Sequence, residues 1–228
     1  YGISDNSLLL GLNAACQTLA VSDASLFVST NVQVLTDGTL GASSAGATTL
    51  AGLASALQAK STTTPFCFTY SGWKLALSPG DSGASALVPS ERVVNSQTLL
   101  GGILLTPTYV PPTKADKDAS NSSDCNPVSV SGTSYLYALN YITGTADSHA
   151  ASFGSAAGSG GKAGEVYKKT TIGKGKASAP SLHTTPGSGA TKVTACMQIG
   201  DKVVCKDVGT ISPVNSHQIS WREPVDQQ

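Results

Sequence analysis

The stretch from Ser131 to Gly144, SGTSYLYALNYITG, constrains the fold of this chain more than any other part of the sequence. Its segment 134–139 is a run of aromatic and apolar residues with high β-propensity. Asn140, Thr143 and Gly144 follow directly, and these residue types favour a turn. The stretch therefore predicts a strand that ends in a tight turn, as expected in an all-β fold.

The composition is typical of a turn-rich, all-β protein. The chain has 228 residues, with 24 glycines and 11 prolines, and can bury a substantial core. Its 14 basic residues balance 14 acidic ones, which argues against a protein that binds nucleic acid specifically. No apolar run reaches about 18 residues, so we expect no membrane span. Because Tyr1 is an improbable translational start, we expect a piece of a longer protein.

Hydrophobic periodicity places further strands along the chain and one helix. The helix is expected within residues 41–60, where Leu50, Leu53 and Leu57 recur at helical spacing, and the Gly/Ser-rich half before it is expected to be mobile. Gly101 and Gly102 predict a bulge or a close backbone approach. Strands are expected at residues 25–35, 66–77 (around a turn at Gly72), 91–94, 98–110, 166–172, 177–184, 192–199 and 202–208.

The five cysteines fit no CxxC, haem-attachment or zinc-finger spacing. Cys196 and Cys205 flank MQIGDKVV, which predicts a hairpin around Gly200 and Asp201, and opposed hairpin positions suit a disulfide. Free buried thiols are the alternative. Cys16 with Cys67 is a weaker second pairing, which leaves Cys125 free or paired with a region outside this chain.

An Asp-rich segment, DKDASNSSD, is a candidate calcium loop. It offers hard oxygen ligands at alternate positions, namely Asp116, Asp118, Ser120, Ser122 and Asp124. An EF-hand loop would instead have glycine at the position of Asn121 and a bidentate glutamate at the position of Pro127. The segment therefore predicts either a Ca²⁺ site, the only cofactor we expect, or a plain solvated loop.

The remaining polar residues do not form a catalytic pattern. The histidines His149, His183 and His217 are scattered, and no GxSxG motif accompanies them, so we expect no hydrolase. Trp73 and Trp221 are expected to pack within the fold. The local basic stretch is interpreted as decoration of an edge strand rather than an anion site, and comprises Lys162, Lys168, Lys169, Lys174 and Lys176.

Taken in order, several motifs resemble the type IV pilus tip adhesins and biogenesis factors of the PilC/PilY type, in their C-terminal β-propeller region. The motifs are YGISDN (1–6), GWKLAL (72–77), ERVVNSQTLLGGILLTPTYVP (91–111), Cys125 with GTSYLYALNYITG (132–144), IGKGKASAPSLHT (172–184) and ISWRE (219–223). The shared order is the specific part of the resemblance. Residues 41–60, 81–90 and 145–164 depart from the family's pattern.

The resemblance implies an exported, non-enzymatic protein at the cell surface, at or near the pilus tip. Such proteins work with minor pilins in a tip complex, support assembly, oppose retraction and attach to host or abiotic surfaces. It also implies a modified β-propeller. At about 40 to 45 residues per blade, this chain would supply about three to four blades. An N-terminal segment or a partner chain would then complete the ring.

The resemblance divides the chain into four regions. Residues 1–60 would form a blade edge with a helical insertion, residues 61–144 the central blades, residues 145–164 a flexible loop, and residues 165–228 the closing blade. Two alternatives stay open. The segment ALNYITG also resembles the blade signature of quinoprotein-type propeller dehydrogenases, and a secreted β-domain of a surface layer is the third interpretation.

Overall fold

The computed structural model describes residues 8–12, 26–60, 69–78, 89–113, 131–148, 153–158, 163–186 and 191–211. These residues are mostly in strands, which confirms the all-β prediction. The elements are β1 (Leu8–Leu12), β2 (Leu26–Val28), β3 (Thr39–Ser44), β4 (Ala47–Thr49), α1 (Leu50–Leu57), β5 (Gly72–Ala76), β6 (Arg92–Val93), β7 (Thr98–Leu100), β8 (Ile103–Val110), β9 (Thr133–Asn140), β10 (Lys169–Lys174), β11 (Ser181–Pro186), β12 (Thr191–Ile199) and β13 (Lys202–Ile211).

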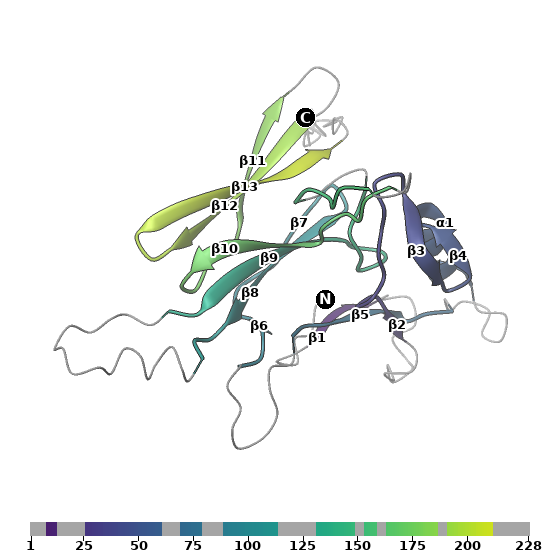
Figure 1. Ribbon diagram of the computed structural model, residues 1–228, viewed down its shortest axis with the longest axis horizontal. Helices are drawn as coiled ribbons and strands as arrows, with labels where there is room; N and C mark the ends of the chain where they lie inside the picture. Colours follow the sequence, from purple (N-terminus) through teal and green to yellow (C-terminus); the bar gives the residue numbers. More distant parts are fainter. Residues whose placement is uncertain are drawn as a thin grey trace, which may run out of the picture.

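The described strands form four separate sheets (Figure 1). The central sheet has the order β10-β9-β8-β6, with β7 also paired to β8. The N-terminal part of the sequence forms a mixed sheet, β1-β5-β2, and the hairpin β3-β4. The C-terminal part forms the antiparallel sheet β11-β12-β13. These sheets close into no ring within the described residues, so the propeller prediction is not confirmed.

Strand β9 lies between the two hydrophobic core clusters and contributes side chains to both. Alternate residues of a strand point to opposite faces of its sheet. Tyr137 and Leu139 accordingly join one cluster, while Leu136 and Ala138 join the other. The first cluster combines β9 with β5 and α1, and the second combines β9 with β8, β10, β12 and β13. Strand β9, the centre of the stretch that most constrains the fold, is thus buried on both faces.

Helix α1 begins and ends inside the segment that the leucine spacing predicts. The N–H of Gly52 donates a 3.1 Å hydrogen bond to Oγ1 of Thr49, which caps the helix N-terminus. Leu50, Leu53 and Leu57 are all buried, as their spacing predicts. The residues before the helix form the hairpin β3-β4, where composition predicted a mobile segment. Ala45 and Gly46 make its turn with positive φ angles of 50° and 76°.

Gly101 and Gly102 turn the chain between β7 and β8, which corrects the single strand predicted for residues 98–110. Both glycines have positive φ angles, 57° and 85°, and Leu100 pairs with Ile103 across them. Two consecutive residues with positive φ make a two-residue hairpin turn rather than a bulge. The N–H of Tyr141 donates a 2.9 Å hydrogen bond to the carbonyl O of Gly102, which attaches this turn to the end of β9.

Other element bounds differ from the predictions by several residues. The segment 25–35 narrows to β2, followed by isolated bridges at Val34 and Leu35. The strands predicted at 166–172 and 177–184 become β10 and β11, each displaced toward the C-terminus. Strands β12 and β13 pair from Thr191 with Ile211 to Ile199 with Lys202, as the predicted hairpin requires. No described helix is long and apolar enough to cross a membrane.

Candidate functional site

The turn after β9 is organised by the side chain of Asn140. Its Oδ1 accepts hydrogen bonds from the N–H groups of Ile142 at 3.0 Å and Thr143 at 3.3 Å, as an Asx turn does. Its Nδ2 donates to Oδ2 of Asp147 at 2.8 Å. Thr143 and Thr145 are fully buried, and their hydroxyls lie 2.8 Å apart. The predicted flexible loop therefore starts with residues that are packed and hydrogen-bonded.

Trp73 of β5 packs on this turn and connects two segments far apart in the sequence. Its Nε1 donates a 2.8 Å hydrogen bond to the carbonyl O of Tyr141, and the side chain is 2% exposed. Gly144 has a φ of 67°, and a Cβ added there would lie 2.3 Å from the indole ring. Only glycine allows the ring to approach the turn this closely. The predicted packing role of Trp73 is confirmed.

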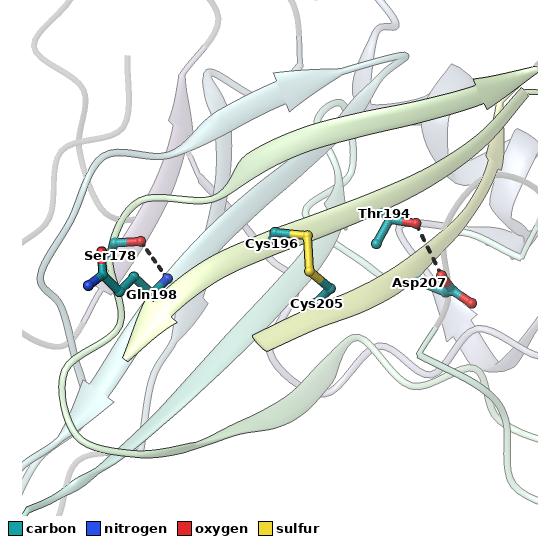
Figure 2. Close-up of a disulfide and its surroundings, with 6 residues drawn as sticks. All are labelled: Ser178, Thr194, Cys196, Gln198, Cys205 and Asp207. Carbon is teal, nitrogen blue, oxygen red and sulfur yellow. Dashed lines mark hydrogen bonds between the residues drawn. A yellow bond between two sulfur atoms is a disulfide. The ribbon is translucent and has the colours of Figure 1, made fainter. Parts of the chain in front are cut away.

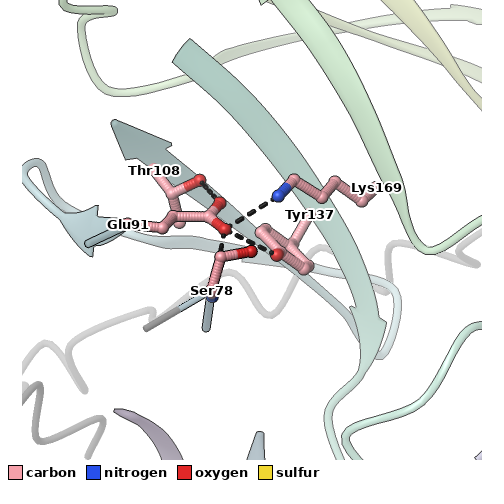
Figure 3. A network of polar contacts seen from close by, with 5 residues as sticks. All are labelled: Ser78, Glu91, Thr108, Tyr137 and Lys169. Atoms are coloured by element: carbon pink, nitrogen blue, oxygen red, sulfur yellow. Dashed lines mark hydrogen bonds and ion pairs between the residues drawn. The ribbon is translucent and has the colours of Figure 1, made fainter. Parts of the chain in front are cut away.

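A buried carboxylate, that of Glu91, joins three strands of the central sheet (Figure 3). Its Oε1 accepts a hydrogen bond from the hydroxyl of Thr108 on β8, and the carboxylate is fully buried. Its Oε2 accepts from the hydroxyl of Tyr137 on β9 at 3.3 Å and pairs with Nζ of Lys169 on β10 at 2.8 Å. Donors therefore contact both oxygens of this carboxylate, and one of them carries a positive charge.

The same glutamate connects the central sheet to the segment after β5. The N–H of Ser78 donates to Oε2 of Glu91 at 3.4 Å, and the N–H of Glu91 donates to the carbonyl O of Ser78 at 2.9 Å. Because the side chain of Glu91 has no exposed surface, it cannot act on a bound substrate from this position. The network is a structural junction between two sheets.

Aromatic rings and partly buried lysines set the electrostatics around this junction. Nζ of Lys169 lies 4.0 Å from the ring centroid of Tyr135 and 5.2 Å from that of Tyr137. Burial raises the pKa of Tyr137 above its ordinary value, and the charge of Glu91 acts in the same direction. Burial also lowers the pKa of Lys168, whose Nζ donates to the carbonyl O of Thr30 at 2.6 Å.

The hairpin β12-β13 contains the disulfide between Cys196 and Cys205 (Figure 2). The two residues are directly opposite in the strand register, as the spacing around the turn predicts. Nearby, Oγ1 of Thr194 donates to Oδ1 of Asp207 at 3.2 Å, and Asp207 pairs with Lys192 at 2.9 Å. The disulfide thus crosslinks a regular hairpin of the C-terminal sheet.

A shallow depression of about 290 Å³ lies between the turn of this hairpin and the segments that flank β6 and β10. It is lined by Asn95, Lys176, Ala177, Ser178, Gln198 and Gly200. The Nδ2 of Asn95 donates to the carbonyl O of Ala177, and the N–H of Gln198 donates to Oγ of Ser178 at 2.9 Å. Its polar groups therefore already serve contacts between the central and C-terminal sheets.

Several residues singled out in the sequence lie outside the described part of the chain. They are Asp116, Asp118, Ser120, Ser122 and Asp124 of the candidate calcium loop, the cysteines Cys16, Cys67 and Cys125, the histidines His149 and His217, and Lys162 and Trp221. The calcium site and the second disulfide stay predictions. Among the residues that the structure does describe, no group of three His, Cys, Asp or Glu side chains is placed to hold a metal ion.

The basic stretch corresponds only in part to its predicted role. Strand β10, which contains Lys169 and Lys174, is an edge strand of the central sheet, as predicted. Lys168 and Lys169, however, direct their Nζ atoms to Thr30 and Glu91, so both contribute to tertiary contacts. The pattern of lysines along the sequence holds no sign of this difference, because it depends on which neighbours the fold supplies.

Sequence reasoning missed the junction residues Glu91 and Tyr137. Glu91 was predicted as the first residue of the strand 91–94, and a charged residue followed by Arg92 leaves no pattern in the sequence that indicates burial. Tyr137 was predicted as a strand residue, but its hydroxyl partner lies 46 residues away. Asn140 was predicted as a turn residue, and the Asx geometry agrees with that prediction.

The four sheets, together with the contacts of Glu91 and Trp73, define an all-β fold with one short helix. No family model and no curated protein matches the chain. Among solved structures, it is similar to the Pseudomonas aeruginosa PilY1 C-terminal domain, at 14% sequence identity and a TM-score of 0.44. The match covers 90% of this chain and 37% of that chain, so this chain spans less than half of the structure it matches.

Proposed function

We propose that this chain is part of a non-enzymatic type IV pilus protein of the PilC/PilY kind, and that it acts as a structural and binding module of the pilus tip. The observation that carries the proposal is that the motifs of the resemblance contact one another. Trp73 of GWKLAL donates its hydrogen bond to Tyr141 of ALNYITG. Glu91 of ERVVNSQTLLGGILLTPTYVP accepts a hydrogen bond from Tyr137 of GTSYLYALNYITG.

A third motif contact supports the same proposal. The hydroxyl of Ser134, in GTSYLY, donates to the carbonyl O of Gly175 at 2.7 Å and accepts from the N–H of Ala177 at 2.9 Å. Gly175 and Ala177 belong to the motif IGKGKASAPSLHT. The motifs within the described part of the chain thus form one continuous set of contacts, which is the behaviour of residues that specify a common fold.

The propeller is the finer part of the proposal. Strands β6, β8, β9 and β10 form an antiparallel path of four strands, and β11, β12 and β13 form a second antiparallel unit. Four antiparallel strands are the unit of a propeller blade. In the proposal, an N-terminal segment of the longer protein or a partner chain supplies the remaining blades. Contacts with minor pilins, retraction control and adhesion to host or abiotic surfaces belong to this complete assembly.

An extracellular location is consistent with the disulfide of β12-β13. Disulfides form and persist in oxidising compartments such as the periplasm and the cell exterior. Cys196 and Cys205 are bonded in the structure. This supports export of the chain without identifying the pilus as its destination.

The direct test is capture of the full-length protein from cells that make it, followed by mass spectrometry of sheared surface fibres. Co-purification with major and minor pilins, at levels well above those of an equally tagged, unrelated secreted protein, is the expected result. Recovery of the protein in the medium without any pilin would overturn the pilus proposal. An optical spectrum of the purified protein addresses the quinoprotein alternative, because a bound quinone absorbs in the near ultraviolet.

A further inference from the structure

Strand β13 is an outer strand that few buried side chains hold in place. Among its residues 202–210, Val208 is the one that enters the core as a buried side chain, at 3% exposure. Val203 is 70% exposed, and Val204 is only partly buried. The ion pair between Lys192 and Asp207 joins side chains that are more than half exposed, so solvent screens it. Apart from the disulfide, backbone hydrogen bonds to β12 therefore supply most of the attachment.

The disulfide is the strongest side-chain link between β12 and β13. Cys196 lies between Ala195 and Met197, which are 0% and 1% exposed and face the core. Because strand side chains alternate between faces, the disulfide lies on the outward face of the sheet. Cys205 is exposed and Cys196 is partly buried. The disulfide therefore lies outside the hydrophobic core, with one of its two cysteines exposed to solvent.

We propose that the Cys196–Cys205 disulfide is a redox-controlled link: a dithiol reductant reduces it in the folded protein, and reduction lets β13 separate from β12. In this step a thiolate of the reductant attacks one sulfur, the Cys196–Cys205 bond breaks, and a mixed disulfide forms. The second thiol of the reductant then displaces this sulfur. Two electrons pass to the cysteine pair, each cysteine ends as a protonated thiol, and the reductant leaves as a disulfide.

The central sheet is expected to stay folded during this change. Strand β12 keeps Val193, Ala195 and Met197 in the core cluster, and β9 keeps Leu136 and Ala138 there. These contacts do not involve the sulfur atoms. Reduction removes the covalent restraint on the hairpin alone, so the loss of stability is local to the edge of the C-terminal sheet.

The experiment is native-state reduction of the full chain with dithiothreitol, with hydrogen exchange and alkylation both measured by mass spectrometry. Peptide mapping separates Cys196 and Cys205 from the other three cysteines. The expected result is alkylation of both residues without denaturant, together with amide exchange in residues 202–211 that is at least about tenfold faster than in the oxidised protein. Exchange in residues 133–140 of β9 stays unchanged.

Two variants control this experiment. The double variant Cys196→Ser/Cys205→Ser should show the fast exchange without reductant and should not respond to it. Lys192→Ala removes the exposed ion pair but keeps the disulfide, and it should exchange like the oxidised parent. The proposal is overturned if alkylation requires denaturant, if exchange in β13 is unchanged after reduction, or if β9 and β13 accelerate together.

Discussion

The indole Nε1 of Trp73 lies 2.8 Å from the carbonyl O of Tyr141 and donates a hydrogen bond to it across 68 residues of sequence. This hydrogen bond connects β5, in the mixed sheet β1-β5-β2, to the turn that follows β9. We expect Trp73→Phe to lower the free energy of unfolding by at least about 2 kcal/mol, since it removes a buried donor and leaves unfilled volume. Urea unfolding followed by circular dichroism measures the loss.

The matched control for this variant is Tyr141→Phe. Tyr141 contributes its backbone carbonyl to the contact, and its side chain is 51% exposed. The control should therefore unfold at nearly the parent urea concentration. Equal losses for the two variants would show that the hydrogen bond is not the stabilising feature.

Gly144→Ala tests the close approach of the Trp73 ring to the turn. The new Cβ would lie 2.3 Å from Cδ2 and Cε3 of Trp73, at a residue with a φ of 67°. We expect a loss of about 3 kcal/mol or more, which combines a left-handed backbone cost with overpacking. Gly46→Ala is the control, because Gly46 has a φ of 76° and nothing within 4 Å of an added Cβ. It should lose about 1–2 kcal/mol. A control that loses as much as Gly144→Ala would contradict the steric argument.

Glu91→Gln tests the buried junction of the central sheet. The amide removes the charge partner of Lys169, and its NH₂ group faces donors where the carboxylate accepted. We expect the free energy of unfolding to fall by about 3 kcal/mol. This is the lower end of the range for a broken buried ion pair, because Lys169 is partly exposed. Thermal or urea unfolding measures it. Asp207→Asn, which breaks the solvent-exposed pair with Lys192, should change the midpoint little.

The raised pKa of Tyr137 predicts that the protein loses stability at alkaline pH. Its pKa is raised in the folded state by burial and by the charge of Glu91, so the unfolded chain loses the phenol proton first. The contribution is fully present below the ordinary pKa of about 10 and declines as the pH rises above it. Lys168 has the opposite effect on stability. Burial lowers its pKa in the folded state, so its contribution to stability increases as the pH rises toward the ordinary lysine pKa and is lost as the pH falls. Urea midpoints from pH 9 to about 11.5 should fall less steeply for Tyr137→Phe than for the parent. Parallel pH profiles would remove Tyr137 from the explanation.

Calcium binding by the segment from Asp116 to Asp124 stays a prediction from the sequence. Titration calorimetry of the full chain with CaCl₂ should show one site, and Asp116→Asn/Asp118→Asn should abolish the heat because it removes two carboxylate ligands. Absence of heat up to about millimolar Ca²⁺ would leave the segment as a solvated loop.

Local patterns predicted those elements whose neighbours in space are also neighbours in sequence. The leucine spacing predicted α1, and the spacing around Gly200 and Asp201 predicted the hairpin of β12 and β13 with its disulfide. Both depend on contacts a few residues apart. The turn between β7 and β8 was missed because Gly-Gly is equally compatible with a bulge, and only the pairing of Leu100 with Ile103 distinguishes them.

The sequence by itself determined that this chain is rich in strands, that Asn140 begins a turn, and that Cys196 and Cys205 can be bonded, since residue propensities and short-range geometry decide these features. The tertiary structure alone decided that Glu91 is buried under Lys169 and that Trp73 lies on Gly144. Their partners are tens of residues away, and the free energy of burying a charge or a ring depends on what the folded chain places beside it.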